Sequence, residues 1–406
     1  MGTYDVAVIG AGIIGSSIAC ELASAGVSVV VLDRQQPARE ASWAAAGMLT
    51  PGPDAPESLP LVPLAQESLR LHPGFVAGVE AASGRSCDYA TEGTQQVFHG
   101  SHAEAERDAF VALHHSLGIE AEPVVVEAAR RMEPALGPEA RAVAWLPDEA
   151  TVDPRLLSEA TVAAAAQRGA QIRRDCAVSS LARTGERCTG VVAGGERIGA
   201  KHVVLAAGAF SGALAPTELA ADAAPGGDAT TAHEVTQCAP THPVRGQMVA
   251  LRSESVRLRR VLRSDRGYLV PRRDGRIIAG STLEDAGFEK RVTAAGLHQI
   301  LSAAFELAPS LAGAEVVETW SGLRPGTPDG LPIIGASDVE GLLIATGHYR
   351  NGIVLAPVTA KLITQIILHG QVERELAARV EFENFSPLRF LSRKASHAPK
   401  SAVASS

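Results

Sequence analysis

The sequence predicts an α/β protein of two domains, in which a nucleotide-binding sheet is interrupted by a second, α+β domain. Three observations predict this fold class. A strand, a glycine-rich turn, a helix and a second strand follow one another within residues 1–34. Two buried strands, at 202–207 and 342–346, each break into a glycine turn. A strand-rich block over 242–324 lies between those two strands in the chain, which favours a mixed or antiparallel second sheet.

The N-terminal unit is typical of the βαβ motif of Rossmann-like folds. An apolar run over 4–9 leads into a GxGxxG turn, a helix is expected over 16–25, and a second apolar run occupies 27–32. Asp33 closes that run, where a carboxylate can accept hydrogen bonds from a ribose diol. The pattern alone would be a weak signal in a chain with 39 glycines, but here the strand, the helix and the acid accompany it.

The three glycines of the turn each have a physical reason. Gly10 lets the backbone turn sharply out of the strand, and Gly12 has no Cβ, so a pyrophosphate can approach the backbone. Gly15 allows the helix to pack closely on the strand. The helix N-terminus then offers N–H groups and a partial positive charge to phosphates. This unit by itself fits NAD as well as FAD.

Length and composition limit the function classes. At 406 residues two domains are the default, and a hydrophobic content of 46% excludes disorder for the chain as a whole. The net charge of -8, without a basic tract, argues against nucleic acid as a main partner. The five cysteines are scattered and form no CxxC, and the twelve histidines show no metal-ligand spacing. We therefore expect neither a disulfide framework nor a metal site.

Localisation is expected to be cytoplasmic. The chain enters a strand at once, which leaves no room for a signal peptide. No uncharged apolar run reaches eighteen residues, so we expect no transmembrane helix.

The first half of the chain contains further local signals. Small residues dominate 40–49, which fits a segment packed against a backbone or a flat ligand, or a plain Ala-rich helix. After an irregular proline-rich stretch we expect a helix over 64–83, strands over 86–100, two helical segments around Gly118 and a short strand over 141–148. Asp153 and Pro154 then start a helix as its N-cap and first residue.

Strand patterns dominate the second half. Strands are expected at 170–173 and 177–181, and 188–193 pairs naturally with 197–201. The buried strand at 202–207 breaks at Gly208, either to bring backbone close to a cofactor or as an ordinary turn. The later elements are a strand at 246–251, a hairpin around Asp274-Gly275, a helix over 293–307, strands over 316–324 and 342–346, and a helix over 354–369.

Four segments together resemble the D-amino-acid oxidase family of FAD-dependent enzymes, and within it the glycine oxidase branch associated with thiazole synthesis. They are the GxGxxG turn, AAAGML at 44–49, GLRPGT at 322–327 and GHYRNGI at 347–353. The resemblance covers nearly the whole chain, from residue 4 to about 369.

The resemblance implies FAD rather than NAD. The cofactor contacts expected from the glycine turns and from the family together are Gly10, Gly12, Ile13, Ile14, Gly15, Asp33, Arg34, Ser42, Ala46, Gly47, Met48, Val178, Gly208, His348, Tyr349, Arg350, Asn351, Gly352, Ile353 and Val354. The sequence departs from the family pattern at Asp33, where many members have Glu, and at Leu283, which falls at a position that lines the family's pocket.

Substrate contacts implied by the resemblance are Arg324 and Arg350, with Tyr268 on the opposite strand. A guanidinium at Arg324 would make two parallel hydrogen bonds to a substrate carboxylate, which a lysine could not do. From its position alone Arg324 could equally be a surface residue beside a proline turn. Arg350 could serve the flavin, the substrate or the entrance, and Tyr268 could be a packed aromatic residue.

The implied activity is oxidation of glycine or a similar small amine. Hydride would pass to flavin N5, dioxygen would reoxidise the flavin with formation of hydrogen peroxide, and the imino acid would hydrolyse to glyoxylate or another keto acid and ammonia. No residue is expected to act as acid or base, and His348 is expected to be a contact or packing residue. Thiamine biosynthesis and a homo-oligomer are implied by the resemblance only.

Other functions remain open from sequence. The enzyme could be a sarcosine or D-amino-acid oxidase, or a D-amino-acid dehydrogenase that passes electrons to a quinone. It could also be a flavin-binding subunit without turnover of its own. Peroxide production separates an oxidase from a dehydrogenase.

The expected domain boundaries follow from the order of the motifs. Residues 1–85, 150–215 and 325–385 form the FAD-binding domain, and residues 86–149 and 240–324 form the substrate-binding domain. Residues 216–240 are expected to be a surface loop or insertion, and 390–406 a disordered tail.

Overall fold

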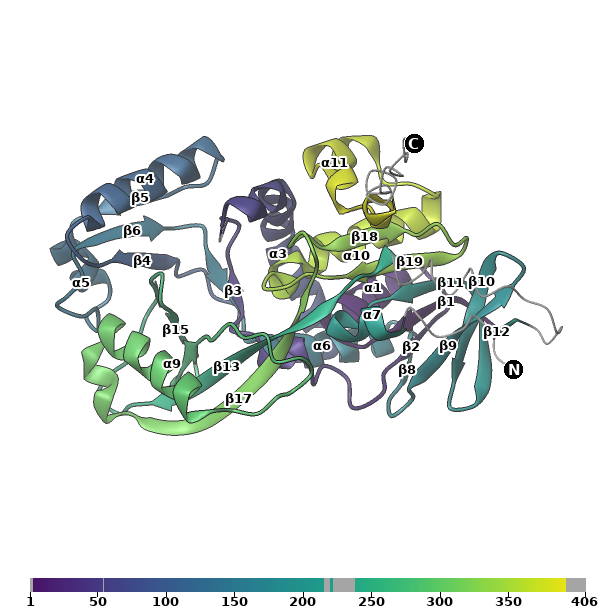
Figure 1. The fold of residues 1–406 in the computed structure, drawn as a ribbon, viewed down its shortest axis with the longest axis horizontal. Helices are drawn as coiled ribbons and strands as arrows, with labels where there is room; N and C mark the ends of the chain where they lie inside the picture. Colours follow the sequence, from purple (N-terminus) through teal and green to yellow (C-terminus); the bar gives the residue numbers. More distant parts are fainter. Residues whose placement is uncertain (1–2, 54, 215–219, 222–237, 392–406) are drawn as a thin grey trace, which may run out of the picture.

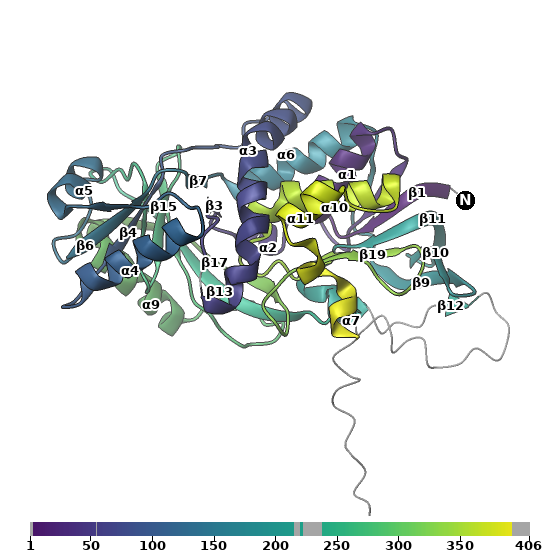
Figure 2. The same cartoon turned by 90° about the horizontal axis from the view of Figure 1, so that it is seen from above.

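The structure is a computed structural model that describes residues 3–53, 55–214, 220–221 and 238–391. Most of the expected loop at 216–240 and nearly all of the expected tail at 390–406 lie outside the described residues. The molecule has two halves side by side (Figure 1). One half is built on a nine-stranded sheet and the other on an eight-stranded sheet. Helix α3 (Val62–Ser83) lies near the middle of the long axis (Figure 2).

The nine-stranded sheet has a parallel centre. Its order is β12-β9-β10-β11-β1-β2-β8, with β19 pairing to β11 and β18 pairing to β19. The strands are β1 (Thr3–Ile9), β2 (Val29–Leu32), β8 (Gln171–Arg173), β9 (Val178–Thr184), β10 (Arg187–Ala193), β11 (Glu196–Leu205), β12 (Ala220–Ala221), β18 (Ile333–Ala336) and β19 (Leu342–Thr346). The hairpin expected at 188–201 is present, but its second strand is continuous with the buried strand at 202–205.

Side-chain alternation along β1 explains how both faces of this sheet are covered. Val6 and Val8 face a core that also contains residues of α1 (Ile13–Ser24), α3, α6 (Pro154–Gln167) and α10 (Gly352–His369). Ala7 and Ile9 face a second core, formed with the strands at 178–205. The expected N-cap is confirmed, because the Asp153 side chain accepts hydrogen bonds from two backbone N–H groups of α6.

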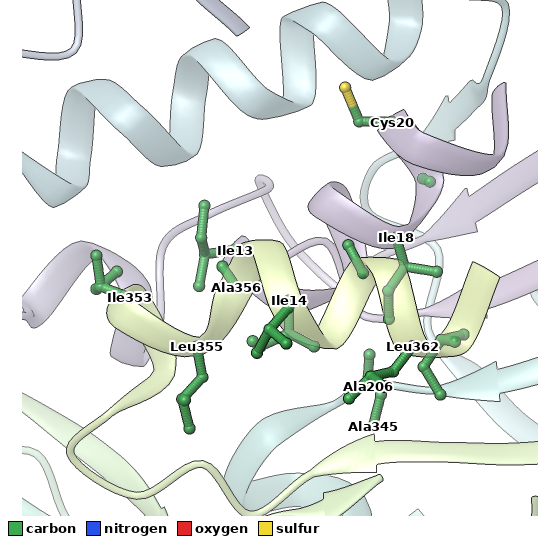
Figure 3. Packing of buried hydrophobic residues seen from close by; sticks show 14 of the residues in the cluster. Ile13, Ile14, Ile18, Cys20, Ala206, Ala345, Ile353, Leu355, Ala356 and Leu362 are labelled. Carbon is green, nitrogen blue, oxygen red and sulfur yellow. The ribbon is translucent and has the colours of Figure 1, made fainter. Parts of the chain in front are cut away.

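Helices α1 and α10 lie side by side, with Ile14 and Ile18 of α1 close to Leu362 of α10 (Figure 3). Ala206 and Ala345, at the ends of β11 and β19, lie below them (Figure 3). Helix α10 is long and apolar enough to cross a membrane, but 61% of it is buried inside the protein. It is therefore a core helix of the folded protein.

The eight-stranded sheet has the order β17-β13-β16-β15-β14-β4-β6-β5. Its strands are β4 (Thr94–Phe98), β5 (Glu122–Val124), β6 (Ala142–Leu146), β13 (His242–Arg252), β14 (Val261–Arg263), β15 (Tyr268–Pro271), β16 (Arg276–Gly280) and β17 (Glu315–Gly326). All pairs are antiparallel except β14 with β4, so the sheet is mixed, as expected. The hairpin around Asp274-Gly275 is confirmed as β15 and β16.

Alternation also gives this sheet two different faces. Val249, Leu269 and Ile277 pack under α9 (Ala294–Leu307) in one core. Met248 and Ile278 belong to a second core, together with the Ala-rich segment around residues 43–48. The second face is therefore the one that meets the half built on the nine-stranded sheet. That half is called the cofactor half below and the half built on the eight-stranded sheet the substrate half, after the roles expected from the sequence.

The remaining described α-helices and strands number seven, and all but α4 are short. They are α2 (Ala41–Ala44), β3 (Met48–Leu49), α4 (Ala103–Ser116), α5 (Val126–Met132), β7 (Ala150–Thr151), α7 (Ser211–Leu214) and α11 (Arg374–Arg379), and β3 pairs with β7. The expectation of strands throughout 86–100 is wrong, because only β4 forms there. Residues before it make a single isolated bridge, from Ala90 to Thr151. The Ala-rich segment is one helical turn and a short strand, not a longer helix.

The domain boundaries stay a prediction. The strands of the nine-stranded sheet come from 3–32, 171–221 and 333–346, and those of the eight-stranded sheet come from 94–146 and 242–326. This membership supports a cofactor half into which the substrate half is inserted.

Candidate functional site

A cavity of about 400 Å³ lies between the two halves and collects most of the expected site residues. The expected residues that line it are Gly10, Gly12, Ile13, Ile14, Asp33, Arg34, Ser42, Ala46, Gly47, Met48, Val178, Gly208, Tyr268, Arg324, His348, Tyr349, Arg350, Asn351, Gly352 and Ile353. Gly15 and Val354 do not line it. The Val354 carbonyl instead accepts hydrogen bonds from Ser68 Oγ at 2.6 Å and from His72 Nε2 at 3.0 Å.

The glycine turn at the end of β1 has the geometry that its sequence predicts. Gly10 has φ +100°, and a Cβ there would lie 2.6 Å from the Ala206 carbonyl oxygen. A Cβ on Gly15 would lie 2.0 Å from the Gly10 carbonyl oxygen, so this glycine sets the distance between helix and strand. A Cβ on Gly12 would meet only Ser42 Oγ, at 3.2 Å. Gly12 therefore keeps the cavity side of the turn open.

Asp33 ties the turn together. Its Oδ2 accepts the Ala11 N–H at 2.8 Å and its Oδ1 accepts the Gln35 N–H at 3.1 Å. Burial raises the pKa of this carboxyl, against the lowering effect of these two hydrogen bonds. Ser42 Oγ accepts the Ile13 N–H at 2.9 Å, at the start of α1. The open turn, the helix N-terminus and the acid together fit a dinucleotide.

The mouth of the cavity beside Arg34 contains residues that the sequence analysis missed. The Arg34 guanidinium stacks over the Phe210 ring at 3.6 Å and pairs with Glu40 at 2.6 Å. Phe210 stacks on Phe288, which belongs to the loop between β16 and α9. Lys290 of the same loop hydrogen-bonds Glu40. Loop residues of the substrate half therefore contact the cofactor half directly.

The turn before α10 forms the opposite wall. Tyr349 has φ +48° and its N–H donates to the Pro325 carbonyl at 3.1 Å, which ties this turn to β17. His348 is buried, and its Nε2 lies 3.0 Å from Thr359 Oγ1. Burial lowers the pKa of His348 to about 3, so the imidazole ring is uncharged near neutral pH. Arg350 is exposed at the rim of the cavity.

Arg324 lies over the eight-stranded sheet with its guanidinium in a fixed position. Its Nη2 donates to Ser281 Oγ at 2.8 Å and its Nη1 donates to the Thr282 carbonyl at 3.2 Å. A Cβ on Gly246 would lie 2.2 Å from Arg324 Nη1, so the guanidinium lies directly on the backbone of β13. This glycine was missed because nothing local distinguishes it.

Tyr268 faces the same cavity, with its hydroxyl 3.4 Å from Met248 Sδ. The sequence predicted Tyr268 on the strand opposite that of Arg324. The two strands, β15 and β17, are not neighbours, because β13 and β16 lie between them. Leu283 is 64% exposed and does not line the cavity, in contrast to the family pattern. Met248, from β13, lines the cavity near Tyr268 instead.

Two arginines join the halves. Arg155 of α6 lies over the Trp43 ring at 3.5 Å and the Trp320 ring at 4.5 Å, and pairs with both oxygens of Glu318. Arg272, at the end of β15, is almost fully buried. Its Nη2 donates to the Ala46 carbonyl, and its Nε lies 3.6 Å from Asp153 Oδ2. The sequence analysis assigned a role to neither arginine.

Within residues 3–53, 55–214, 220–221 and 238–391, no group of three or more His, Cys, Asp or Glu side chains is placed to hold a metal ion. The five cysteines, all within the described residues, form no disulfide, and four of them are buried.

Known proteins resemble this chain in both sequence and structure. The family model described as FAD dependent oxidoreductase matches residues 5–366. The glycine oxidase of Pseudomonas putida is 35% identical over 368 residues, which cover 89% of this chain and 94% of that protein. The crystal structure of glycine oxidase from Bacillus cereus matches with a TM-score of 0.83 at 30% identity, over 92% of this chain and 97% of that one.

A second kind of relative is longer. The bifunctional protein ThiO/ThiG of Trichormus variabilis is 36% identical over 373 residues, which cover 90% of this chain and 53% of that protein. The chain therefore spans about half the length of such bifunctional relatives.

Proposed function

This chain belongs to the FAD dependent oxidoreductase family, and on that premise we propose that it is an oxidase of glycine or a similar small amino acid. Its similarity to known glycine oxidases supports a glycine oxidase-like, FAD-dependent amino-acid oxidase. The choice of glycine as substrate is the proposal.

The residues of the cofactor half fit FAD. Gly12 leaves the turn open to the cavity, and Asp33 stands at the end of β2 where a ribose is expected. Gly47 has φ +75°, and a Cβ there would lie 2.0 Å from the Val152 carbonyl oxygen, so this wall is made of backbone. The N-terminus of α10, at Gly352, also lines the cavity. Its N–H groups would stabilise negative charge on a bound flavin.

One observation carries the substrate assignment, namely the Arg324 guanidinium fixed over Gly246 in the same cavity. A fixed guanidinium suits a carboxylate, because it can donate two parallel hydrogen bonds. Tyr268 supplies a hydroxyl that faces the same cavity. These two groups would hold the amino acid so that its Cα–H faces the cofactor, and orientation is the main contribution that the protein makes.

FAD, when bound, supplies the acceptor for the substrate hydride, and dioxygen is the proposed final acceptor. The protein needs no strong base for this step. His348 is neutral and hydrogen-bonded to Thr359, which supports a contact or packing role. Hydrolysis of the imino acid to a keto acid and ammonia would follow in water.

The wider assignments are proposals that rest on the relatives. A role in the thiazole branch of thiamine biosynthesis is supported by the names of the ThiO/ThiG relatives. The net charge of -8 supports the proposal that nucleic acid is not a partner. A cytoplasmic location and a homo-oligomer are proposed from the sequence and its resemblance to the family.

The test is an absorbance spectrum of the purified protein, followed by anaerobic addition of glycine, sarcosine and D-alanine in turn. Flavin bands that bleach with glycine and recover in air with formation of peroxide are the expected result. Bleaching that reverses only with an added electron acceptor would indicate a dehydrogenase. A stronger response to sarcosine or D-alanine would change the substrate, and a protein that takes up no FAD would overturn the proposal.

A further inference from the structure

A second arginine, Arg263, lines the same cavity as Arg324 and Tyr268. It ends strand β14, directly opposite Tyr268 in the register with β15. Residues directly opposite each other project from the same face of a sheet. Arg263 and Tyr268 therefore face the cavity together, and Arg263 is one strand farther from Arg324 than Tyr268 is.

The guanidinium of Arg263 is only partly used within the protein. Its Nε donates to Gln96 Oε1 at 2.7 Å, and its Nη2 donates to Glu149 Oε1 at 3.2 Å. In the described part of the chain Nη1 has no hydrogen-bond partner, although a guanidinium carries five N–H donors. The side chain is only 17% exposed, and Glu149 is 2% exposed. A charged donor with spare N–H groups is thus held at the wall of the cavity.

Among the described residues, Glu149 is the carboxylate that forms an ion pair with Arg263. Burial lowers the pKa of the His114 imidazole, and the nearby Arg263 charge acts in the same direction, so both favour the neutral form. Gln96 is uncharged. A ligand carboxylate at Nη1 would therefore meet a guanidinium with a single buried counter-ion, in surroundings where charged hydrogen bonds are strong.

We propose that Arg263 recognises a second anionic group on the substrate, so that the site accepts amino acids carrying a carboxylate on the nitrogen substituent or side chain as well as the one held by Arg324. This proposal rests on the proposed function, because it deepens the substrate class of the same site. The two guanidinium groups stand on either side of Tyr268. The strands β17 and β14 that carry them are four spacings apart, roughly 19 Å at about 4.8 Å per spacing. These spacings separate the strand backbones and not the guanidinium groups, so a length series is needed to find the matching substrate.

A length series tests the proposal. N-carboxymethyl, N-carboxyethyl and N-carboxypropyl glycine are compared with N-alkyl glycines of the same length, and D-aspartate and D-glutamate are compared with D-alanine. The measured quantity is the rate constant of anaerobic flavin reduction divided by the apparent Kd of the substrate. We expect one chain length to be preferred over its uncharged partner by at least tenfold. The preferred substrate also shows whether the second carboxylate belongs on the nitrogen substituent or on the side chain at Cα.

Two variants separate recognition from a structural role. Glu149→Gln removes the counter-ion and keeps the shape, so the preference for the acid over its uncharged partner should rise severalfold. The double variant Arg263→Met with Glu149→Gln avoids leaving a buried unpaired carboxylate. In this variant the preference should fall at least tenfold below that of the unmodified enzyme. Opposite changes from the two variants are not expected of a purely structural ion pair.

The outcomes are distinguishable from failure of the proposed function. If glycine reduces the flavin but the acids show no preference at any length, Arg263 does not recognise an anion. If the preference exists but neither variant differs in it from the unmodified enzyme, another group is responsible. If no amino acid reduces the flavin, the proposed function fails first. The flavin spectrum and the urea midpoint of each variant show that it is folded.

Discussion

The two walls of the cavity are built in different ways. The cofactor wall is made of backbone, and its main device is the absence of side chains at Gly10, Gly12 and Gly47. The substrate wall is made of long side chains, Arg324, Tyr268 and Arg263, that come from three strands of one sheet. On the proposed function, the flat, extended cofactor is accommodated where side chains are absent, whereas the small substrate is selected by charged side chains.

The boundary between the walls depends on buried arginines. Arg272 reaches from β15 to the Ala46 carbonyl and to Asp153, which caps α6. Burial lowers the pKa of Arg272, while nearby carboxylates act in the opposite direction. Arg155 fills the space between Trp43 and Trp320. Contacts of Arg272 and Arg155, which join residues of both halves, thus fix the relative position of the two walls.

The largest expected effect is on this boundary. Arg272→Met leaves Asp153 without its most buried partner and the Ala46 carbonyl without a donor. We expect the free energy of unfolding to fall by about 3–5 kcal/mol, as for other broken buried ion pairs. Urea denaturation measures it. Arg276→Met is the matched control, since Arg276 reaches the same carboxylate at 3.4 Å but is more exposed. Equal losses in the two variants would show that Arg272 does not join the halves.

Two glycine substitutions test whether the cofactor wall works by missing atoms. Gly15→Ala places a Cβ 2.0 Å from a backbone oxygen, and we expect it to lower the free energy of unfolding by about 3 kcal/mol. Gly12→Ala places its Cβ on the cavity side, so it should weaken FAD retention and change stability by less than about 1 kcal/mol. Urea midpoints and bound flavin per chain are measured together. A stable Gly12→Ala protein with full FAD would contradict the assignment.

Arg324→Ala tests the substrate wall. Loss of two charged hydrogen bonds should raise KM for the amino acid by about 100-fold, equivalent to about 2.7 kcal/mol, while bound FAD is retained. Arg324→Lys keeps the charge but not the paired geometry, so it should recover only part of the loss. Steady-state peroxide formation gives KM, and the flavin spectrum gives FAD content. An unchanged KM would remove Arg324 from the carboxylate role.

The smallest effect concerns pH. Burial lowers the pKa of His72 to about 4, against 6.5 for a free imidazole, so the folded protein binds fewer protons than the unfolded chain below pH 6.5. The stabilisation is present above pH 6.5 and is lost as the pH falls toward 4. Between pH 7 and pH 5 this histidine should cost about 2 kcal/mol of unfolding free energy.

The check is a pair of urea titrations at pH 7 and pH 5 on the unmodified protein and on His72→Gln, whose amide can still donate to the Val354 carbonyl. The pH dependence of the variant should be smaller by about 2 kcal/mol. His348, with its pKa lowered to about 3, keeps its own share of the dependence in both proteins. An identical pH dependence in the two proteins would mean that His72 does not stay neutral in the fold.

Local patterns in the sequence determined much of the fold. The GxGxxG turn, the Asp153 cap and the hairpin around Asp274-Gly275 were all predicted, because each depends on the backbone preferences of a few neighbouring residues. Strands over all of 86–100 were not found, because a strand also needs a partner and the residues before β4 lack one beyond Ala90. Most of the residues of the cofactor wall could therefore be predicted from the sequence.

The tertiary structure alone decided the substrate wall and the boundary. Tyr268 lies three strands from β17, and Arg263 reaches the cavity only because β14 pairs with β15. Arg155 and Arg272 acquire their partners from segments more than one hundred residues away. The physical reason is that a side chain's direction follows from the local strand, but its neighbours follow from the order of strands in the sheet. That order depends on the packing of the whole chain, which no local pattern contains.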